Sequence, residues 1–284
     1  MILSVVIITY NEEANIGRAL ASVQALVADG KGEIVVVDSG STDRTVEIAK
    51  SFGTKVFIEE WKGYAAQKNS AIDKAEGDWI LSLDADEEVS PDLVAHIGRA
   101  MTEEEHGPFE WNVAPAFDVR YADLRTDVRL LPQAFWINRK NHFLGRLIGH
   151  GGFYPDRKLR LFTRGSARFD ETRVVHEDAH TNRRTAVVKV GAILHHSYPT
   201  LADYIDHMNR YSSLGAEMVV AKGQRGFSFF SIVLRPLATF IYNYFFRLGF
   251  LDGREGLLLH LYHAVYVSWK YSKAWELARK KESR

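Results

Sequence analysis

The sequence has no cysteine among its 284 residues. Disulfide bonds and metal sites built from thiolates are therefore excluded, and a reducing compartment is expected. No signal peptide is expected either, because the apolar run at residues 2–8 is short and lacks both a basic start and a small-residue cleavage site. Hydrophobic residues make up 46% of the chain, enough to bury a large core in one domain or in one domain with an extension.

Two common nucleotide-binding motifs are missing. No Gly-x-Gly-x-x-Gly follows the first apolar run, and no Walker-type lysine loop occurs in the chain. The main sequence evidence for assigning the chain to the dinucleotide-dependent oxidoreductases or to the P-loop NTPases is therefore missing.

The net charge of zero hides an uneven distribution. Residues 1–110 contain 9 Lys and Arg against 21 Asp and Glu, whereas residues 111–284 contain 27 against 15. The basic half could meet phosphates on a nucleotide, a glycolipid or a membrane surface. The alternative is two solvated faces that attract each other.

The first hundred residues alternate between strand and helix patterns. The strand runs are continuously apolar, as expected for parallel strands covered on both faces. Asn11 is predicted to cap the first helix, with Glu12 and Glu13 in its first turn. The fourth helix is predicted to begin at Pro91. Four such units in a row predict an α/β fold with a doubly wound, mostly parallel sheet. The strands are expected at residues 2–9, 33–39, 54–60 and 78–86.

Beyond about residue 106 this alternation ends. Two antiparallel strands are expected at residues 109–120 and 157–165, with a glycine-rich basic loop at residues 139–158. From Leu201 onward the pattern is helical. The predicted division is a domain at residues 1–200, with halves at 1–106 and 107–200, followed by a helical region at 201–284.

Polar residues follow three of the predicted strands. In a doubly wound sheet, ligands bind beyond the carboxyl ends of the strands, so these residues are expected to face one crevice. Asp84 and Asp86 share a face there, and two such carboxylates repel unless a cation or a proton lies between them. A divalent ion such as Mg²⁺ or Mn²⁺, also held by phosphate oxygens, resolves that repulsion. The three stretches are Thr9 to Glu12, Asp38 to Ser41, and Asp84 to Asp86.

Asp38 ends the second strand and has two interpretations. It can form an acidic turn into the next helix, or its carboxylate can accept the imide N–H of a uracil base. Both can hold, since Asp43 is better placed at the helix start and Asp38 is better placed for the crevice.

Several motifs together resemble those of a known family. They look like the inverting, metal-dependent nucleotide-sugar glycosyltransferases of family two, which have the GT-A fold. They are most similar to bacterial lipopolysaccharide core glucosyltransferases. The resemblance implies a UDP-sugar donor and a divalent metal, and its N-terminal motifs cover about a third of the chain. The motifs are VVIITYNEEANIGRAL, IVVVDSGSTDRT, AAQKNSAIDKAEGDWILSLDADEEVSPDL, GHGGFYPDRKLRLF and VVHE.

The resemblance implies that the crevice binds the nucleotide. Thr9, Tyr10 and Glu12 would hold the uracil and the ribose, with Tyr10 against the base. Asp38 would pair with the uracil. Lys68 has an alternative as a solvated helix residue. The implied donor-binding residues are Thr9, Tyr10, Asn11, Glu12, Asp38, Gln67, Lys68, Asn69 and Asp84.

The resemblance also implies a metal ion at the Asp-x-Asp motif. Asp86 would bind the metal and the diphosphate, and Asp84 the ribose or the metal. The cation would stabilise the leaving diphosphate more in the transition state than in the ground state. His195 could provide a third ligand, although lone histidines are more often structural.

An inverting transfer needs a general base that deprotonates the acceptor hydroxyl. Glu177 is the predicted base, with Asp178 second and Asp156 third, and the alternative is a surface turn with charged residues. The Gln-x-x-Arg-Trp motif of processive polymer synthases is not apparent, which favours a single transfer.

Basic and aromatic residues are interleaved between residues 139 and 164. Arginine binds phosphate in a forked geometry, and aromatic faces stack on sugar rings, so a phosphorylated sugar acceptor is expected. No nucleic-acid fold signature accompanies them. The basic residues are Arg139, Lys140, Arg146, Arg157, Lys158, Arg160 and Arg164, and the aromatic ones are Phe143, Phe153 and Tyr154.

Residues 227–281 are rich in aromatic side chains and cations. They are interrupted too often for a spanning helix, by Arg235, Pro236, Arg247 and Asp252, so interfacial helices on an anionic inner leaflet are expected. The alternatives are ordinary packing onto the rest of the chain and a homo-oligomer contact.

Together these features predict a glycosyltransferase that is peripheral on the cytoplasmic face of the inner membrane. It would transfer a hexose, with glucose from UDP-glucose as the expected case, to an inner-core sugar of a lipopolysaccharide precursor. The alternatives are transfer to a polyprenyl phosphate or other glycan acceptor, use of another donor such as UDP-N-acetylglucosamine, and a non-catalytic sugar-nucleotide-binding module.

Overall fold

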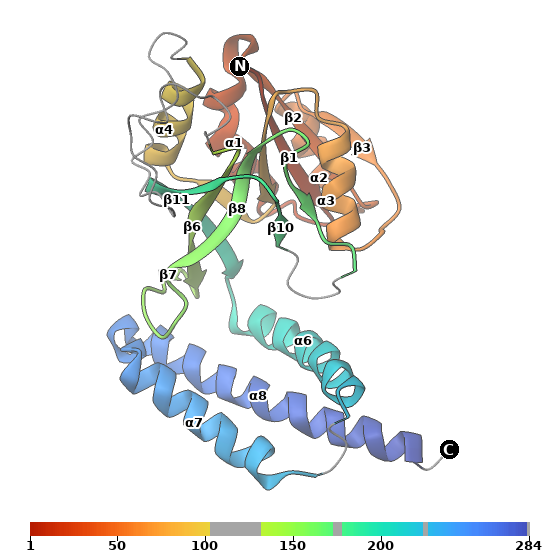
Figure 1. Cartoon of the computed structure of the whole chain (residues 1–284), viewed down its shortest axis with the longest axis vertical. Helices are drawn as coiled ribbons and strands as arrows, with labels where there is room; N and C mark the ends of the chain where they lie inside the picture. The colour runs from red at the N-terminus through yellow and green to blue at the C-terminus, as the bar shows by residue number, and fades with distance from the viewer. Residues whose placement is uncertain (103–131, 173–177, 224–226, 283–284) are drawn as a thin grey trace. The chain divides into compact units, whose positions relative to one another are not determined.

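The computed structural model of the chain describes residues 1–102, 132–172, 178–223 and 227–282 (Figure 1). The strand predicted at residues 109–120 and the predicted base Glu177 lie outside these residues. The chain forms two compact units, the first of residues 1–139 and 156–195 and the second of residues 140–155 and 196–284.

Among the described residues, nine strands form one sheet, which confirms the predicted α/β class. Four strands pair in parallel, as their continuous apolar runs predicted. Their order in the sheet is β3-β2-β1-β4. The antiparallel pairs β4–β8, β8–β6 and β11–β5 extend the sheet, and a separate antiparallel pair joins β9 to β10. The strands are β1 Leu3–Thr9, β2 Gly32–Asp38, β3 Lys55–Ile58, β4 Trp79–Asp84, β5 Glu87–Val89, β6 Ala134–Phe143, β7 Arg146–Leu147, β8 Asp156–Thr163, β9 Arg168–Phe169, β10 Ala179–His180 and β11 Thr185–Tyr198.

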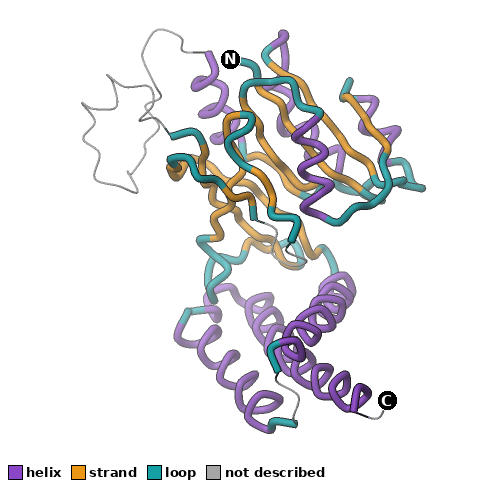
Figure 2. The backbone as a smooth tube through the Cα atoms, turned by 45° about the vertical axis from the view of Figure 1, so that its right-hand side comes forward, coloured by secondary structure: helices purple, strands orange, loops and turns teal. Residues whose placement is uncertain are grey.

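Helices cover both faces of the parallel strands (Figure 2). Alternate side chains of β1 enter different cores: Val5 and Ile7 pack with α1, α2 and α4, whereas Val6 packs with α3. The start of α4 at Pro91 is as predicted. The helices are α1 Ile16–Val27, α2 Thr45–Ser51, α3 Tyr64–Asp73 and α4 Pro91–Thr102, with a short 3-10 turn, η1, at Ala28–Gly30.

The first helix begins later than predicted. It starts at Ile16, and its first turn contains no acidic residue. Asn11 instead lies in the left-handed region at φ 54°, and its Oδ1 accepts a hydrogen bond from the backbone nitrogen of Thr42 at 2.8 Å. The capping role predicted for Asn11 and the first-turn positions predicted for Glu12 and Glu13 are therefore wrong. These residues form the loop after β1, which is hydrogen-bonded to the loop after β2.

The second unit is helical from Leu201, as predicted. Thr200 caps α6 in a capping box, in which it exchanges hydrogen bonds with Asp203. The long helix α8 packs against both α6 and α7 (Figure 1). No helix in the described part of the chain is both long and apolar enough to cross a membrane. The elements are α6 Leu201–Ala221, the π-helical turn η3 Phe230–Leu234, α7 Arg235–Ile241, the π-helical turn η4 Tyr242–Phe246, the 3-10 turn η5 Gly249–Asp252 and α8 Gly253–Glu282.

Candidate active site

The carboxyl ends of β2, β1 and β4 lie side by side. Thr9 at the end of β1 is opposite Asp38 at the end of β2, and Ile8 is opposite Asp84 at the end of β4. β1 lies between β2 and β4, and neighbouring strands are about 4.8 Å apart. Asp38 and Asp84 therefore end the two strands that flank β1, at the same edge of the sheet. We call this edge the strand-end rim; it comprises Thr9 to Glu12, Asp38 to Ser41, and Asp84 to Asp86.

The loops that follow β1 and β2 are bound to each other. The backbone nitrogen of Asn11 donates to Ser41 Oγ at 2.8 Å, and that of Glu12 donates to Thr45 Oγ1 at 2.7 Å. The hydrogen bond from Thr42 to the Asn11 side chain completes this pairing. Short polar side chains in the two loops thus fix the position of the rim residues.

Asp38 is fully buried at the end of β2. Its Oδ1 accepts hydrogen bonds from the backbone nitrogens of Gly40 and Ser41 at 2.9 and 2.8 Å, and its Oδ2 accepts one from the Ser41 hydroxyl. The acidic turn expected from the sequence is therefore present. A carboxylate oxygen can accept two hydrogen bonds, so Oδ2 retains capacity for a ligand, and the pairing of Asp38 with uracil stays a prediction.

Two cations pair with Asp84. Lys68 Nζ lies 2.6 Å from its Oδ1, and an Arg160 Nη atom lies 2.7 Å from its Oδ2. Burial alone would raise the pKa of Asp84, but the charges of Arg160 and Lys68 outweigh it and hold the pKa well below its usual range. Lys68 is buried on α3, so its interpretation as a solvated helix residue is wrong. Asp84 thus carries a charge that the protein itself neutralises.

Glu87 extends these pairs into an ion network that the sequence did not predict. Its Oε1 lies 2.7 Å from Arg160 and 3.3 Å from Arg139, and its Oε2 accepts a hydrogen bond from the backbone nitrogen of Asp84. Glu87 and Arg160 are both buried, and buried charges require such pairing. One signal could have revealed the network: Arg160 stands between Leu159 and Leu161 in a buried stretch of β8, where a cation needs an anionic partner.

Asp86 lies beside a histidine. His195 Nε2 is 3.2 Å from Asp86 Oδ2, so the structure brings together two residues predicted as metal ligands. Burial favours a raised pKa for Asp86, but the charge and hydrogen bond of His195 lower the pKa below its usual value. Burial raises the pKa of Glu12, and the nearby charges of Asp86 and Asp84 raise it further. Glu12 therefore belongs to the same acidic cluster.

A divalent ion fits Asp86 and His195 better than Asp84. The first two residues offer an oxygen and a nitrogen donor, whereas both carboxylate oxygens of Asp84 are in ion pairs. Within the ranges that the structure describes, no group of three or more His, Asp or Glu side chains is placed to hold a metal ion. An ion bound here would share its coordination with another ligand, such as a diphosphate. The assignment of Asp84 as a metal ligand stays a prediction.

Among the residues that the structure describes, several buried polar atoms have no hydrogen-bond partner. They include Thr9 Oγ1 on β1, Ser39 Oγ after β2 and Gln67 Nε2 on α3. Buried polar atoms are normally paired, and Thr9 and Ser39 belong to the strand-end rim, so their unpaired oxygens fit a site that takes a polar ligand. The ring of Tyr10 is exposed, which leaves it available for the predicted contact with a base.

Asn69, which was predicted to line the crevice, is bound to the protein. Its Nδ2 donates to the carbonyl oxygen of Phe169 at 3.0 Å and to Glu171 Oε1 at 2.8 Å, and its Oδ1 accepts from the backbone nitrogen of Phe169. These bonds fix α3 to β9. A donor-binding role for Asn69 stays a prediction.

Two of the three candidate bases are in ion pairs. Lys158 Nζ lies 3.0 Å from Asp178 Oδ1, and Arg139 lies 2.8 Å from Asp156 Oδ2. The first candidate, Glu177, lies outside the described residues. The choice of base stays a prediction.

The predicted acceptor loop is shorter and less available than its sequence indicated. β6 runs to Phe143, and β7 occupies Arg146–Leu147. Phe143 and Arg160 are buried, and Arg139 is paired with Glu87 and Asp156. Part of the basic pattern therefore neutralises carboxylates of the protein, because those carboxylates are buried and need partners.

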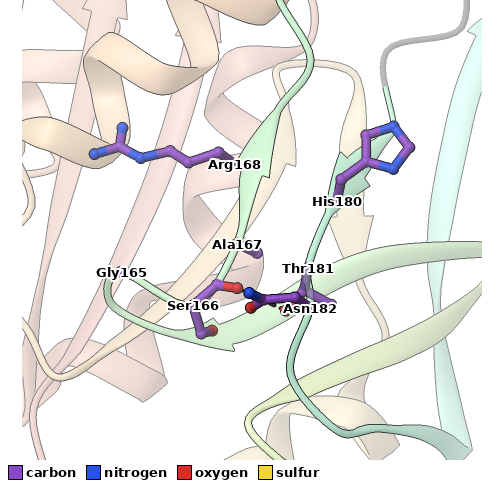
Figure 3. Close-up of a pocket in the computed structure, with 7 residues that line it drawn as sticks. All are labelled: Gly165, Ser166, Ala167, Arg168, His180, Thr181 and Asn182. Carbon is purple, nitrogen blue, oxygen red and sulfur yellow. Dashed lines mark hydrogen bonds between the residues drawn. The ribbon is translucent and has the colours of Figure 1, made fainter.

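A shallow pocket of about 320 Å³ lies elsewhere in the first unit. It is lined by the turn and strand at Gly165 to Arg168 and by His180 to Asn182, and none of the predicted site residues lines it (Figure 3). Figure 3 shows that Arg168 points away from the other lining side chains, and it pairs with Asp73 on α3. The pocket is therefore separate from the strand-end rim.

Known proteins of one family resemble this chain. Residues 4–168 match the family model described as Glycosyl transferase family 2. An uncharacterized glycosyltransferase of Rickettsia typhi is 31% identical over 98% of this chain and 88% of its own length. The lipopolysaccharide core biosynthesis glycosyltransferase LpsC of Rhizobium meliloti is 28% identical over 96% of this chain and 92% of its own. A crystal structure of Staphylococcus aureus TarS with UDP has 18% identity and a TM-score of 0.48, covering 99% of this chain and 92% of TarS. The α/β architecture is the class that the motifs predicted, and the chain belongs to glycosyl transferase family 2.

Proposed function

We propose that the chain is an inverting hexosyltransferase that transfers glucose from UDP-glucose to an inner-core sugar of a lipopolysaccharide precursor. The observation that carries the proposal is the strand-end rim, where Thr9, Asp38 and Asp84 end three adjacent parallel strands. Ligands of doubly wound sheets bind at this place. The similarity to LpsC, which is named for lipopolysaccharide core biosynthesis, supports the class of acceptor.

In the proposed reaction, the acceptor hydroxyl attacks the anomeric carbon while the bond to the diphosphate breaks. Glu177, with Asp178 as the second candidate, would take the proton of that hydroxyl. Asp86 and His195 would hold a divalent cation, which offsets the charge of the leaving diphosphate when bound. Lys68 and Arg160 would keep Asp84 ionised and fixed, in place to contact the ribose.

A glycolipid acceptor places this reaction at a membrane. We therefore propose that the chain works as a peripheral protein at the cytoplasmic face of the inner membrane, where a UDP-sugar and a lipopolysaccharide precursor meet.

A screen of nucleotide sugars against a purified, truncated lipopolysaccharide tests the proposal. The mass of the acceptor should rise by one hexose with UDP-glucose, in the presence of Mg²⁺ or Mn²⁺. Glu177→Gln should keep UDP binding, measured by calorimetry, and lose turnover. Metal-independent UDP binding without transfer from any donor would instead indicate a non-catalytic binding module.

A further inference from the structure

One face of the helical segment at residues 229–246 is apolar and exposed. This segment comprises η3, α7 and η4, and its exposed apolar side chains recur at intervals of three or four residues, several of them in adjacent pairs such as Phe245 and Phe246. Phe246 is 75% exposed and Phe230 is 59% exposed, values that are unusual for phenylalanine. We call this surface the apolar face; it comprises Phe230, Leu234, Leu237, Ile241, Phe245 and Phe246.

The opposite side of the same segment is packed and hydrogen-bonded. Pro236 is buried, and the carbonyl oxygen of Ile232 accepts a hydrogen bond from Ser268 Oγ of α8 at 2.8 Å. The ring of Phe227, just before the segment, contacts that of Trp275 of α8 at 5.5 Å between centroids. The segment is therefore anchored within the second unit, and the apolar face is the side that this packing leaves uncovered.

The charged residues along the segment are cationic. Residues 227–251 include Arg235 and Arg247 and no Asp or Glu. Arg254 follows and is exposed, whereas Asp252 is buried and accepts hydrogen bonds from the backbone nitrogens of residues 149 and 150. The charge that accompanies the apolar face is therefore positive.

An anionic bilayer matches both properties. Aromatic and aliphatic side chains enter the boundary between headgroups and acyl chains, while arginines bind the anionic headgroups. A second copy of the chain, docked on the same face about a twofold axis, would bring the cations of one copy close to those of the other. A lipid surface avoids that repulsion.

We propose that the apolar face lies in the plane of an anionic bilayer, with its six side chains in the headgroup–acyl boundary and Arg247 and Arg254 among the headgroups. The docking surface itself is independent of the sugar transfer. Its benefit, access to a glycolipid acceptor, rests on the proposed function.

The absence of cysteine allows a direct test with the full-length chain. Single cysteines would be introduced by Leu237→Cys and Phe246→Cys, and labelled with an environment-sensitive fluorophore. Ile58→Cys provides the matched control, because Ile58 is an exposed apolar residue, 65% exposed, on β3 of the first unit. The probes are vesicles of phosphatidylethanolamine and phosphatidylglycerol at three to one, and vesicles of phosphatidylcholine alone.

With the anionic vesicles, labels at positions 237 and 246 should shift to shorter wavelength and become protected from a water-borne quencher, and the label at position 58 should not. Binding should weaken with salt and with phosphatidylcholine, and Arg254→Gln should reduce it about fivefold. The proposal is overturned if no vesicles bind, or if positions 237 and 246 are no better protected than position 58. Protection without vesicles, together with dimers in sedimentation, would show that a second copy covers the face.

A triple variant separates docking from chemistry. Leu237→Ser, Phe245→Ser and Phe246→Ser together should reduce vesicle binding at least tenfold with an unchanged circular dichroism spectrum. The variant should transfer sugar normally to a delipidated acceptor and at least tenfold more slowly to an acceptor in vesicles. If the triple variant lost transfer equally on both acceptors, a docking role would be contradicted. If the wild type itself transferred no sugar to either acceptor, that result would count against the proposed function and not against docking.

Discussion

The first unit buries charged side chains at the strand ends of its sheet, whereas the second unit exposes aromatic side chains along its helices. Glu87 and Arg160 are withdrawn from water in the first, and Phe230 and Phe246 remain in water in the second. Both arrangements reverse the usual distribution of polar and apolar groups. The difference fits the two ligands that we propose, a charged one at the strand-end rim and an apolar one at the apolar face.

The two regions also differ in how they depend on their partners. Each carboxylate of the ion network needs a cation of the protein, because a buried charge without a partner is strongly destabilising. An exposed phenylalanine needs no partner for folding. Substitutions in the first region should therefore affect stability or turnover, and those on the apolar face should affect neither stability nor transfer to a delipidated acceptor.

The largest effect should come from Asp86→Asn. This change removes a negative charge beside His195 that the proposed cation needs, so turnover should fall roughly 1000-fold, or about 4 kcal/mol. The measurement is transfer from UDP-glucose at saturating Mn²⁺. Asp92→Asn, an exposed carboxylate in the first turn of α4, is the matched control and should be active. Near-normal turnover of Asp86→Asn would remove Asp86 from the site.

Arg160→Met tests the ion network itself. It leaves Asp84 and Glu87 without their shared cation, so the free energy of unfolding should fall by about 3–5 kcal/mol. Urea denaturation at pH 7 measures this change. Lys55→Met, which removes a half-exposed lysine paired with Glu33 and Glu76, should cost far less, because exposed ion pairs contribute little to stability. Equal losses in the two variants would show that burial of the network does not matter.

Gly151→Ala tests whether the second unit is tightly packed behind its exposed face. A Cβ at Gly151, with φ +66°, would lie 1.9 Å from Cε1 of the buried His260. Gly145 has a similar φ of +80° and open space around it. Gly151→Ala should therefore reduce the free energy of unfolding by roughly 1–3 kcal/mol more than Gly145→Ala. A difference near zero would indicate that His260 moves aside without cost.

The pH dependence of stability should reveal the lowered pKa of Asp84. Because its pKa is lower in the folded chain, the ionised form stabilises the fold above pH about 4, the unfolded value, and this contribution is lost as pH falls through the folded pKa. The stability gap between wild type and Asp84→Asn should therefore narrow on acidification, by about 1.4 kcal/mol for each unit of pKa lowering. Urea denaturation between pH 7 and pH 3 measures the gap, and a constant gap would be the opposite result.

The smallest effect should come from Phe246→Ser. The Phe246 side chain stays mostly exposed in the folded chain, so its removal takes away little buried surface. The free energy of unfolding should therefore change by no more than about 0.5 kcal/mol. Phe143→Ala, in the core of the same unit, should cost about 3–5 kcal/mol. A large loss in Phe246→Ser would mean that the apolar face is covered by the protein itself.

Much of the fold could be predicted from local patterns. Continuous apolar runs gave the four parallel strands, and Pro91 and Leu201 marked helix starts that the structure confirms. The position of Asn11 could not be predicted, because its hydrogen bond goes to a loop that follows a different strand. Local propensity favours a helix cap there, and the contact with Thr42 overrides it.

The acids of the candidate site and Lys68 could be predicted from the sequence, but the pairing of Lys68 and Arg160 with Asp84 could not. Asp38, Asp84 and Asp86 follow strands, and strand ends meet at one edge. Lys68 and Arg160 reach Asp84 from a helix and from an antiparallel strand, and only the sheet order brings them together. The sequence therefore assigned Arg160 to an acceptor loop, although it neutralises a buried carboxylate.

The most direct test of the central claim is a crystal structure of the chain with UDP and Mn²⁺. We expect the uracil beside Asp38 and Tyr10, the ribose near Asp84, and the Mn²⁺ between the diphosphate and Asp86. UDP bound away from the ends of β1, β2 and β4, with no contact to Asp38 or Asp86, would contradict the account.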